Sequence, residues 1–115
     1  MTRPIKFRRV GFKPNVSYFK PAGVPMAQLE EVVLTMDEFE AIRLKDVEEL
    51  DQVEAAEKMN ISQPTFNRIL GSARNKIADA IVNGKAIRIE GGHYKFTNIE
   101  RGKGFGRGRM RRGGF

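Results

Sequence analysis

Four polar residues with the chemistry to recognise DNA bases lie within six positions of one another. They are Gln63, Thr65, Asn67 and Arg68. Gln and Asn side chains form paired hydrogen bonds with adenine, Arg does so with guanine, and the Thr methyl group contacts the methyl group of thymine. This short segment therefore predicts a surface that reads the edges of bases through hydrogen bonds and contacts, without covalent chemistry.

Other residues have the chemistry to hold phosphates. Ser62 begins the same segment, where a hydroxyl and the free N–H groups at the start of a helix suit an anion. Arg74 and Lys76 follow further along and are expected to contact the DNA backbone. Auxiliary basic residues lie towards the two ends of the chain: Arg8, Arg9, Arg107, Arg109, Arg111 and Arg112.

A long helix over residues 62–83 is predicted to position these side chains. Ser62 is a favourable N-cap, Pro64 suits the first turn, and Gly84 supplies the left-handed residue that ends a helix. Apolar residues recur along the segment at helical spacing, which indicates one face turned towards a core: Phe66, Ile69, Leu70, Ala73, Ile77, Ala80 and Ile81.

Two shorter helices are predicted before it. Thr35 and Glu38 have the spacing of a capping box, which indicates a helix that continues to about Val47. A second helix is expected over Gln52–Met59, where small Ala55 lets the next helix approach closely.

The turn after the second helix has the chemistry of a helix-turn-helix. Asn60 tolerates the left-handed conformation that a tight turn demands. The three helices together predict a mostly α fold with a helix-turn-helix over residues 52–73, whose third helix enters the major groove. The alternative is a plain three-helix bundle with a polar face that is only solvated.

The β structure is open to two interpretations. Residues 86–89 and 93–96 flank Gly91 and Gly92, a pair that suits the turn of a β-hairpin. Alternatively, residues 87–89 pair with residues 32–34 and form a small sheet beside the helices.

Charge divides the 115 residues into three parts. The chain carries 21 Lys and Arg against 14 Asp and Glu, a net charge of +7. Residues 1–25 have a net +6 and form a predicted extended arm, because four prolines forbid a long helix there. Residues 26–84 have a net −6, and residues 85–115 have a net +7. The folded domain is expected to cover residues 26–96. Residues 97–115 form a Gly/Arg-rich tail that is predicted to be disordered.

The composition disfavours catalysis and cofactor binding. The absence of cysteine excludes disulfides, thiolate chemistry and Cys-ligated metal. The one histidine, His93, has no catalytic partner in the sequence, so we expect neither an enzyme nor a cofactor. No apolar run reaches the ~18 residues of a membrane span, and no secretory signal is recognisable. We therefore expect a cytoplasmic protein without membrane contact.

Longer strings resemble a small prokaryotic family of uncharacterised, predicted DNA-binding proteins. The resemblance covers about residues 3–92 and is strongest in these strings: FKPAGVP, QLEEVVLT, LTMDEFEAIRL, SQPTFNRIL and VNGKAIRIEGG. Its helix-turn-helix is similar to region 4 of sigma-70 factors, which reads the −35 promoter element. The resemblance implies a sequence-specific duplex-DNA-binding protein that regulates transcription. Many relatives carry cysteines in the N-terminal arm that could bind a metal, and this chain has none.

Two other functions compete with this interpretation. The Gly/Arg-rich tail has the composition of an RNA-binding segment. The acidic first and second helices are expected to point away from DNA, and they suit an interaction module that contacts RNA polymerase, another regulator or a second copy. A homodimer would read two half-sites.

Overall fold

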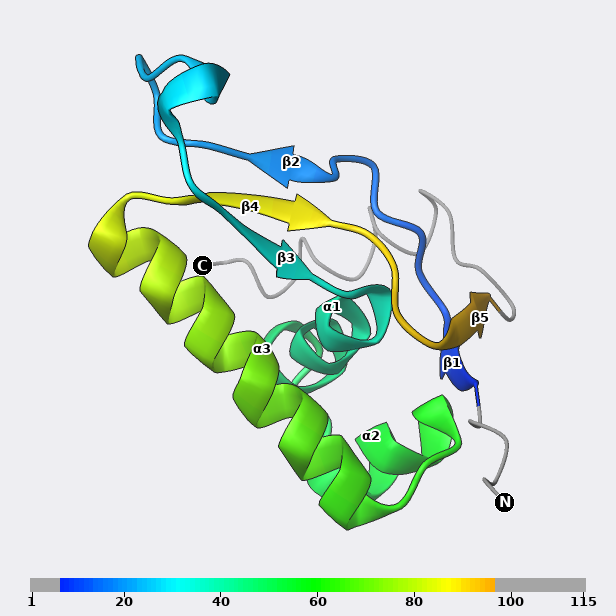
Figure 1. Cartoon of the computed structure of the whole chain (residues 1–115). Helices are drawn as coiled ribbons and strands as arrows, with labels where there is room; N and C mark the ends of the chain where they lie inside the picture. Colours follow the sequence, from blue (N-terminus) through cyan, green and yellow to red (C-terminus); the bar gives the residue numbers. More distant parts are fainter. Residues whose placement is uncertain (1–6, 97–115) are drawn as a thin grey trace, which may run out of the picture.

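Helix α3 is the longest element of the computed structural model, which describes residues 7–96 (Figure 1). The elements in chain order are β1 (Arg8–Val10), β2 (Tyr18–Phe19), η1 (Met26–Gln28), β3 (Glu31–Leu34), α1 (Met36–Ile42), η2 (Arg43–Val47), α2 (Gln52–Met59), α3 (Gln63–Asn83), β4 (Ala86–Ile89) and β5 (Tyr94–Phe96). The three-stranded sheet, α1 and α2 lie along α3, and a two-stranded sheet packs against α1 and α2.

The three-stranded sheet has the strand order β2–β4–β3. β3 and β4 run parallel, with Val32 opposite Ile87 and Leu34 opposite Ile89, and β2 adds antiparallel to the other edge of β4. Parallel neighbours require a long crossover connection, which the helices between β3 and β4 provide. Of the two arrangements open in the sequence, the pairing of residues 32–34 with 87–89 is therefore confirmed.

The alternative hairpin through Gly91 and Gly92 does not form, because these glycines run over the start of α1. The Gly91 carbonyl accepts a hydrogen bond from the Met36 N–H at 2.8 Å. Gly92 has φ +101°, and a Cβ atom there would lie 2.8 Å from Asp37 Oδ1 and 2.9 Å from Thr35 Cβ. The chain then continues into β5, which pairs parallel with β1 in a second, two-stranded sheet.

The helix boundaries follow local signals. Thr35 and Glu38 form the expected capping box at α1, and a π-helical segment, η2, carries the helix on to Val47. Asp51 caps α2, and Ser62 and Gly84 cap the two ends of α3. The three predicted helices are thereby confirmed.

The core has two parts that share α3. The first joins α1, η2, α2 and the N-terminal half of α3: Ala41, Leu44, Ala55, Ala56, Met59, Phe66, Ile69 and Leu70. The second joins both sheets to α1 and to the middle of α3: Val10, Leu34, Met36, Ala73 and Ile89. Ile81 departs from the predicted inward face and is 74% exposed.

The prediction of a mostly α fold requires correction to an α/β fold. Strands from both ends of the described chain form the two sheets, and their pairing is non-local. The predicted disorder of residues 97–115 lies outside the described residues. None of the helices in residues 7–96 is long and apolar enough to cross a membrane.

Candidate nucleic-acid interface

A tight turn sets the direction of α3 relative to α2. Asn60 adopts the left-handed conformation, with φ 60° and ψ 46°, as its residue type predicts. The N–H groups of Asn60 and Ile61 donate to carbonyls of the last turn of α2, including that of Ala56. The turn is thereby closed by backbone hydrogen bonds, and α3 begins two residues later.

Small and aromatic side chains fix the N-terminal half of α3 against α2. Ala55 and Phe66 are fully buried, and Ala56 and Leu70 are nearly so. Replacing Phe66 by alanine would cost about 3–5 kcal/mol, as is typical for a buried Phe. The inner face of α3 is therefore held firmly, and its outward side chains have a defined direction.

Two residues that were predicted to contact DNA, Ser62 and Thr65, instead cap the first turn of α3. The Ser62 hydroxyl accepts a hydrogen bond from the Thr65 N–H at 3.2 Å and donates to Thr65 Oγ1 at 3.0 Å. Thr65 is half-buried. Since Pro64 has no N–H, few free donors remain at this helix end.

Three predicted base-reading residues project freely from the same end. Gln63, Asn67 and Arg68 are exposed, and no side-chain hydrogen bond or ion pair engages any of them within residues 7–96. Asn67 follows Gln63 by four residues, so both lie on one side of the helix. Arg68 lies beside Asn67 and towards the opposite edge of the exposed face.

Gly71 lies on the same exposed face, one turn further along α3, and is not among the site residues predicted from the sequence. A Cβ atom on Gly71 would have no neighbour within 4 Å, so nothing in the fold requires glycine there. Glycine inside a helix costs about 1 kcal/mol relative to alanine. An isolated glycine within a helical pattern was the available signal.

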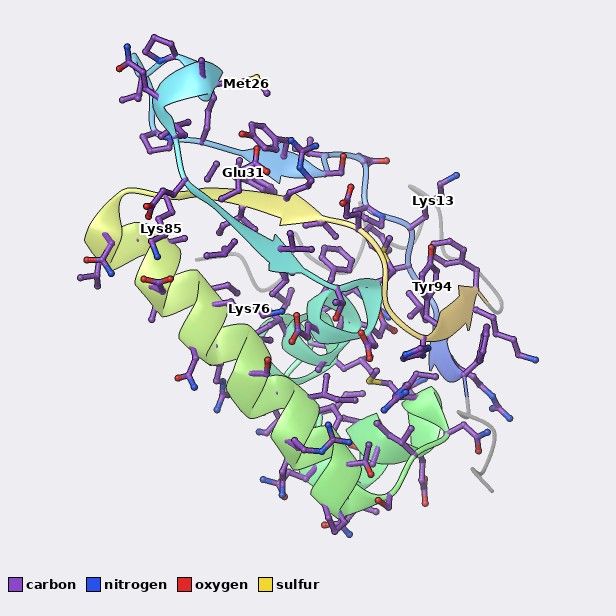
Figure 2. All side chains as sticks on the ribbon, viewed as in Figure 1. Lys13, Met26, Glu31, Lys76, Lys85 and Tyr94 are labelled. Atoms are coloured by element: carbon purple, nitrogen blue, oxygen red, sulfur yellow. The ribbon has the colours of Figure 1, made fainter. Side chains whose placement is uncertain are left out.

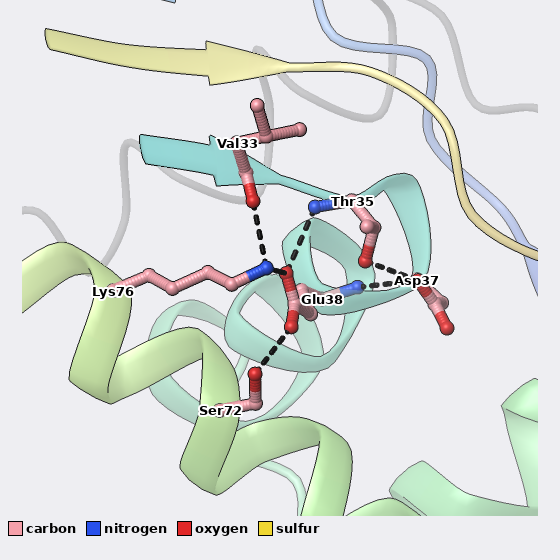
Figure 3. A network of polar contacts seen from close by, with 6 residues as sticks. All are labelled: Val33, Thr35, Asp37, Glu38, Ser72 and Lys76. Atoms are coloured by element: carbon pink, nitrogen blue, oxygen red, sulfur yellow. Dashed lines mark hydrogen bonds and ion pairs between the residues drawn. The ribbon is translucent and has the colours of Figure 1, made fainter. Parts of the chain in front are cut away.

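Lys76, predicted to hold a phosphate, is bound within the fold (Figures 2 and 3). Its Nζ lies 2.8 Å from Glu38 Oε1 and 2.7 Å from the Val33 carbonyl oxygen. The Ser72 hydroxyl and the Thr35 N–H also donate to the Glu38 carboxylate. This Glu38 network joins β3, α1 and α3.

The Glu38 network also sets the protonation of its carboxylate. Burial raises the pKa of Glu38, but the hydrogen bonds from Lys76, Ser72 and Thr35 outweigh it, so the net pKa is lowered. Glu38 is therefore ionised at neutral pH, and it attracts the Lys76 ammonium strongly.

Arg74 has a partner on the surface. Its guanidinium makes two hydrogen bonds to the carboxylate of Asp46 in η2. These bonds raise the pKa of Arg74, and its side chain is 51% exposed. A phosphate would have to compete with Asp46 for this side chain.

The predicted basic arms are described only in part. Arg8 points inward, and its Nε lies 3.7 Å from Asp37 Oδ2. Arg9 is exposed. The four tail arginines, at positions 107, 109, 111 and 112, lie outside the described residues. Residues 7–96 contain no group of three or more His, Cys, Asp or Glu side chains that could hold a metal ion.

The fold defines a small α/β protein in which a capped helix exposes polar side chains at its N-terminal end. The chain belongs to the family described as "Protein of unknown function DUF134", whose model matches residues 1–97.

Curated relatives carry the name UPF0251 protein. The one from Caldanaerobacter subterraneus subsp. tengcongensis is 64% identical over 95 residues, which cover 83% of this chain and 80% of the relative. The one from Thermoanaerobacter pseudethanolicus is 63% identical with the same coverage. The one from Moorella thermoacetica is 64% identical over 94 residues, or 82% of this chain and 63% of the relative. No solved structure matches the chain.

Proposed function

We propose that this protein binds duplex DNA sequence-specifically through a helix-turn-helix formed by α2 and α3, and that it regulates transcription. The observation that carries the proposal is the exposed end of α3, where Gln63, Asn67 and Arg68 are free of partners within residues 7–96. These side chains pair with adenine and guanine edges in the major groove. The similarity of the sequence to region 4 of sigma-70 factors supports the same conclusion.

The turn before α3 supports this proposal independently. A recognition helix contacts bases with its N-terminal residues while the preceding helix crosses above it. Here Asn60 sets the crossing, and Phe66 is buried between the two helices. The free polar side chains occupy the first two turns after the crossing.

Gly71 supports a close approach of DNA to α3. Its position is one turn beyond Asn67, on the exposed face, and its missing side chain leaves the helix backbone accessible. A major groove about 12 Å wide admits a helix closely, so a small residue on the outward face favours deep insertion.

The proposed roles follow the contacts that each side chain makes. Gln63, Asn67 and Arg68 read bases, and Thr65 contributes its methyl group from the edge of the helix. Ser62 acts mainly as the cap of α3. Lys76 stabilises the fold through Glu38, whereas Arg74 reaches a phosphate only by leaving Asp46.

Selection from a pool of random-sequence duplexes at defined ionic strength tests the proposed function. The full chain should enrich a motif, and the spacing of any repeated half-sites would report a homodimer. Single-stranded RNA should then fail to displace a labelled enriched duplex from the protein. A pool without enrichment, or a preference for the RNA, would contradict the proposal and favour the tail as an RNA-binding segment.

A further inference from the structure

The two-stranded sheet places two cations side by side on its exposed face. In the parallel pair of β1 and β5, Arg9 lies opposite Lys95 and Val10 lies opposite Phe96. Residues in register share a face of the sheet, and side chains alternate between faces along each strand. Val10 is fully buried, whereas Arg9 and Lys95 are both exposed.

No carboxylate in the described part of the chain lies within ion-pair distance of this pair. Like charges directly opposite each other destabilise a sheet. Neither Arg9 nor Lys95 forms an ion pair or a side-chain hydrogen bond within residues 7–96. Asp37 instead contacts Arg8, on the inner face of the same sheet. The exposed pair therefore suits an anion from outside the molecule.

The inner face anchors the sheet, so the backbone positions of the two cations are fixed. The Tyr94 and Phe96 rings meet edge to face at 5.2 Å, and Figure 2 labels Tyr94 on β5. The Arg8 N–H donates to the His93 carbonyl at 3.0 Å. Neighbouring strands lie about 4.8 Å apart, so the two charged groups can share one phosphate or contact adjacent phosphates.

The sheet lies one helix away from the proposed base-reading surface. α2 contacts α3 and also contacts β1 (Figure 1). A helix with its side chains is about 10–12 Å across, and the major groove is about 12 Å wide. With α3 in the groove, β1 and β5 would therefore lie near the phosphates that border it.

We propose that Arg9 and Lys95 bind the phosphodiester backbone of the duplex whose bases α3 reads. This inference rests on the proposed function and adds a second, sequence-independent contact to it. Phe7 and His93 precede the two cations by two residues each, and their rings lie 6.3 Å apart. Phe7 is 52% exposed, which suits apolar contact with the sugars between phosphates.

Fluorescence anisotropy of the full chain with a labelled random-sequence duplex pool, measured across a range of salt, tests the inference. Arg9→Gln together with Lys95→Gln should weaken binding about tenfold and reduce the salt slope by up to about 1.8, or 0.9 for each phosphate that is no longer neutralised. The exchange variant Arg9→Lys with Lys95→Arg keeps both charges and should bind nearly as the wild type does. Lys20→Gln, which removes one charge beside β2, is a second control.

Thermal unfolding of the free protein separates DNA binding from a structural role of the two cations. If they only stabilised the fold, the double variant would have a lower melting temperature. Removing the like-charge pair should leave the melting temperature unchanged or raise it, while DNA binding falls. Unchanged affinity and salt slope in the double variant would overturn this inference, and the proposed function would stand if the wild type still enriches a motif. A wild type that binds no duplex would overturn both.

Discussion

At the residue scale, the free side chains of α3 differ sharply from its bound ones. Gln63, Asn67 and Arg68 have no partner in residues 7–96, whereas Lys76 is held by Glu38. The residue types alone could not separate these groups, because Glu38 lies 38 positions from Lys76 in the sequence. The exposed and unpartnered residues are the ones free to contact another molecule.

Arg68→Ala is expected to cost about 1–3 kcal/mol of binding free energy on the preferred duplex and to relax one position of the sequence preference. The guanidinium makes no contact that the fold needs, so stability should change little. Anisotropy with the enriched duplex and with single-base variants of it measures both effects. An equal decrease in affinity on every sequence would identify Arg68 as a phosphate contact instead.

Gly71→Ala should change stability and binding in opposite directions. Alanine favours a helix by about 1 kcal/mol over glycine, and the site has room for the methyl group, so the free energy of unfolding should rise. DNA binding should weaken, because in the proposed complex the added methyl group would face the groove. Urea unfolding and anisotropy measure the two effects.

Ala78→Gly is the matched control for this substitution. Ala78 is exposed two turns further along α3, and glycine there should lower stability by a similar amount. Its DNA affinity should stay unchanged. If Gly71→Ala bound DNA as tightly as the wild type, no close approach at Gly71 would be needed.

At the element scale, local signals explain the helices, and non-local contacts explain the rest. Asn60, Ser62 and Gly84 mark the turn and the ends of α3 through their own conformational preferences. The pairing of β3 with β4 depends on a crossover of three helices, which no short pattern specifies. β2 has only two residues and carries no periodic signal of its own.

Of the two β arrangements that the sequence left open, the hairpin does not form, for a reason at the same scale. Gly91 and Gly92 fit a two-residue turn, but their freedom is used where the chain passes close to Thr35 and Asp37. Ile81 likewise has helical spacing with Ile77, yet it lies beyond the reach of the core and is exposed.

The Glu38 network should make the stability of the fold depend on pH. Because the folded pKa of Glu38 is lowered from 4.5, its contribution is fully present above that value and disappears as pH falls through the folded pKa. Glu38→Gln should therefore cost about 1–3 kcal/mol at neutral pH, and less in acid. Urea unfolding at both pH values measures the difference.

Glu57→Gln is the control for this pH dependence, because Glu57 is exposed on α2. It should leave stability nearly unchanged at both pH values. If Glu38→Gln lowered the free energy of unfolding as much in acid as at neutral pH, the carboxylate charge would contribute nothing to stability.

At the scale of the whole molecule, the net charge lies outside the described residues. Residues 7–96 contain 13 cations and 13 acids, so the +7 of the chain belongs to residues 1–6 and 97–115. If the protein binds DNA as proposed, we expect the chain ends to supply the long-range attraction and the neutral domain to supply the specificity.

Deleting residues 101–115, which carry six cations, should weaken binding to every duplex alike. The slope of log affinity against log salt should flatten by about 0.9 for each phosphate that the tail had neutralised. Anisotropy over a salt series measures this slope. A slope equal to that of the full chain would mean that the tail does not touch DNA.

The central claim is that the N-terminal end of α3 reads bases. Its most direct test is duplex selection repeated with a variant that combines Gln63→Ala, Asn67→Ala and Arg68→Ala. We expect the wild type to enrich a motif, whereas the folded variant still binds duplexes through its cations but enriches none. Recovery of the wild-type motif by the variant would contradict base reading by this end of α3 and place sequence recognition elsewhere.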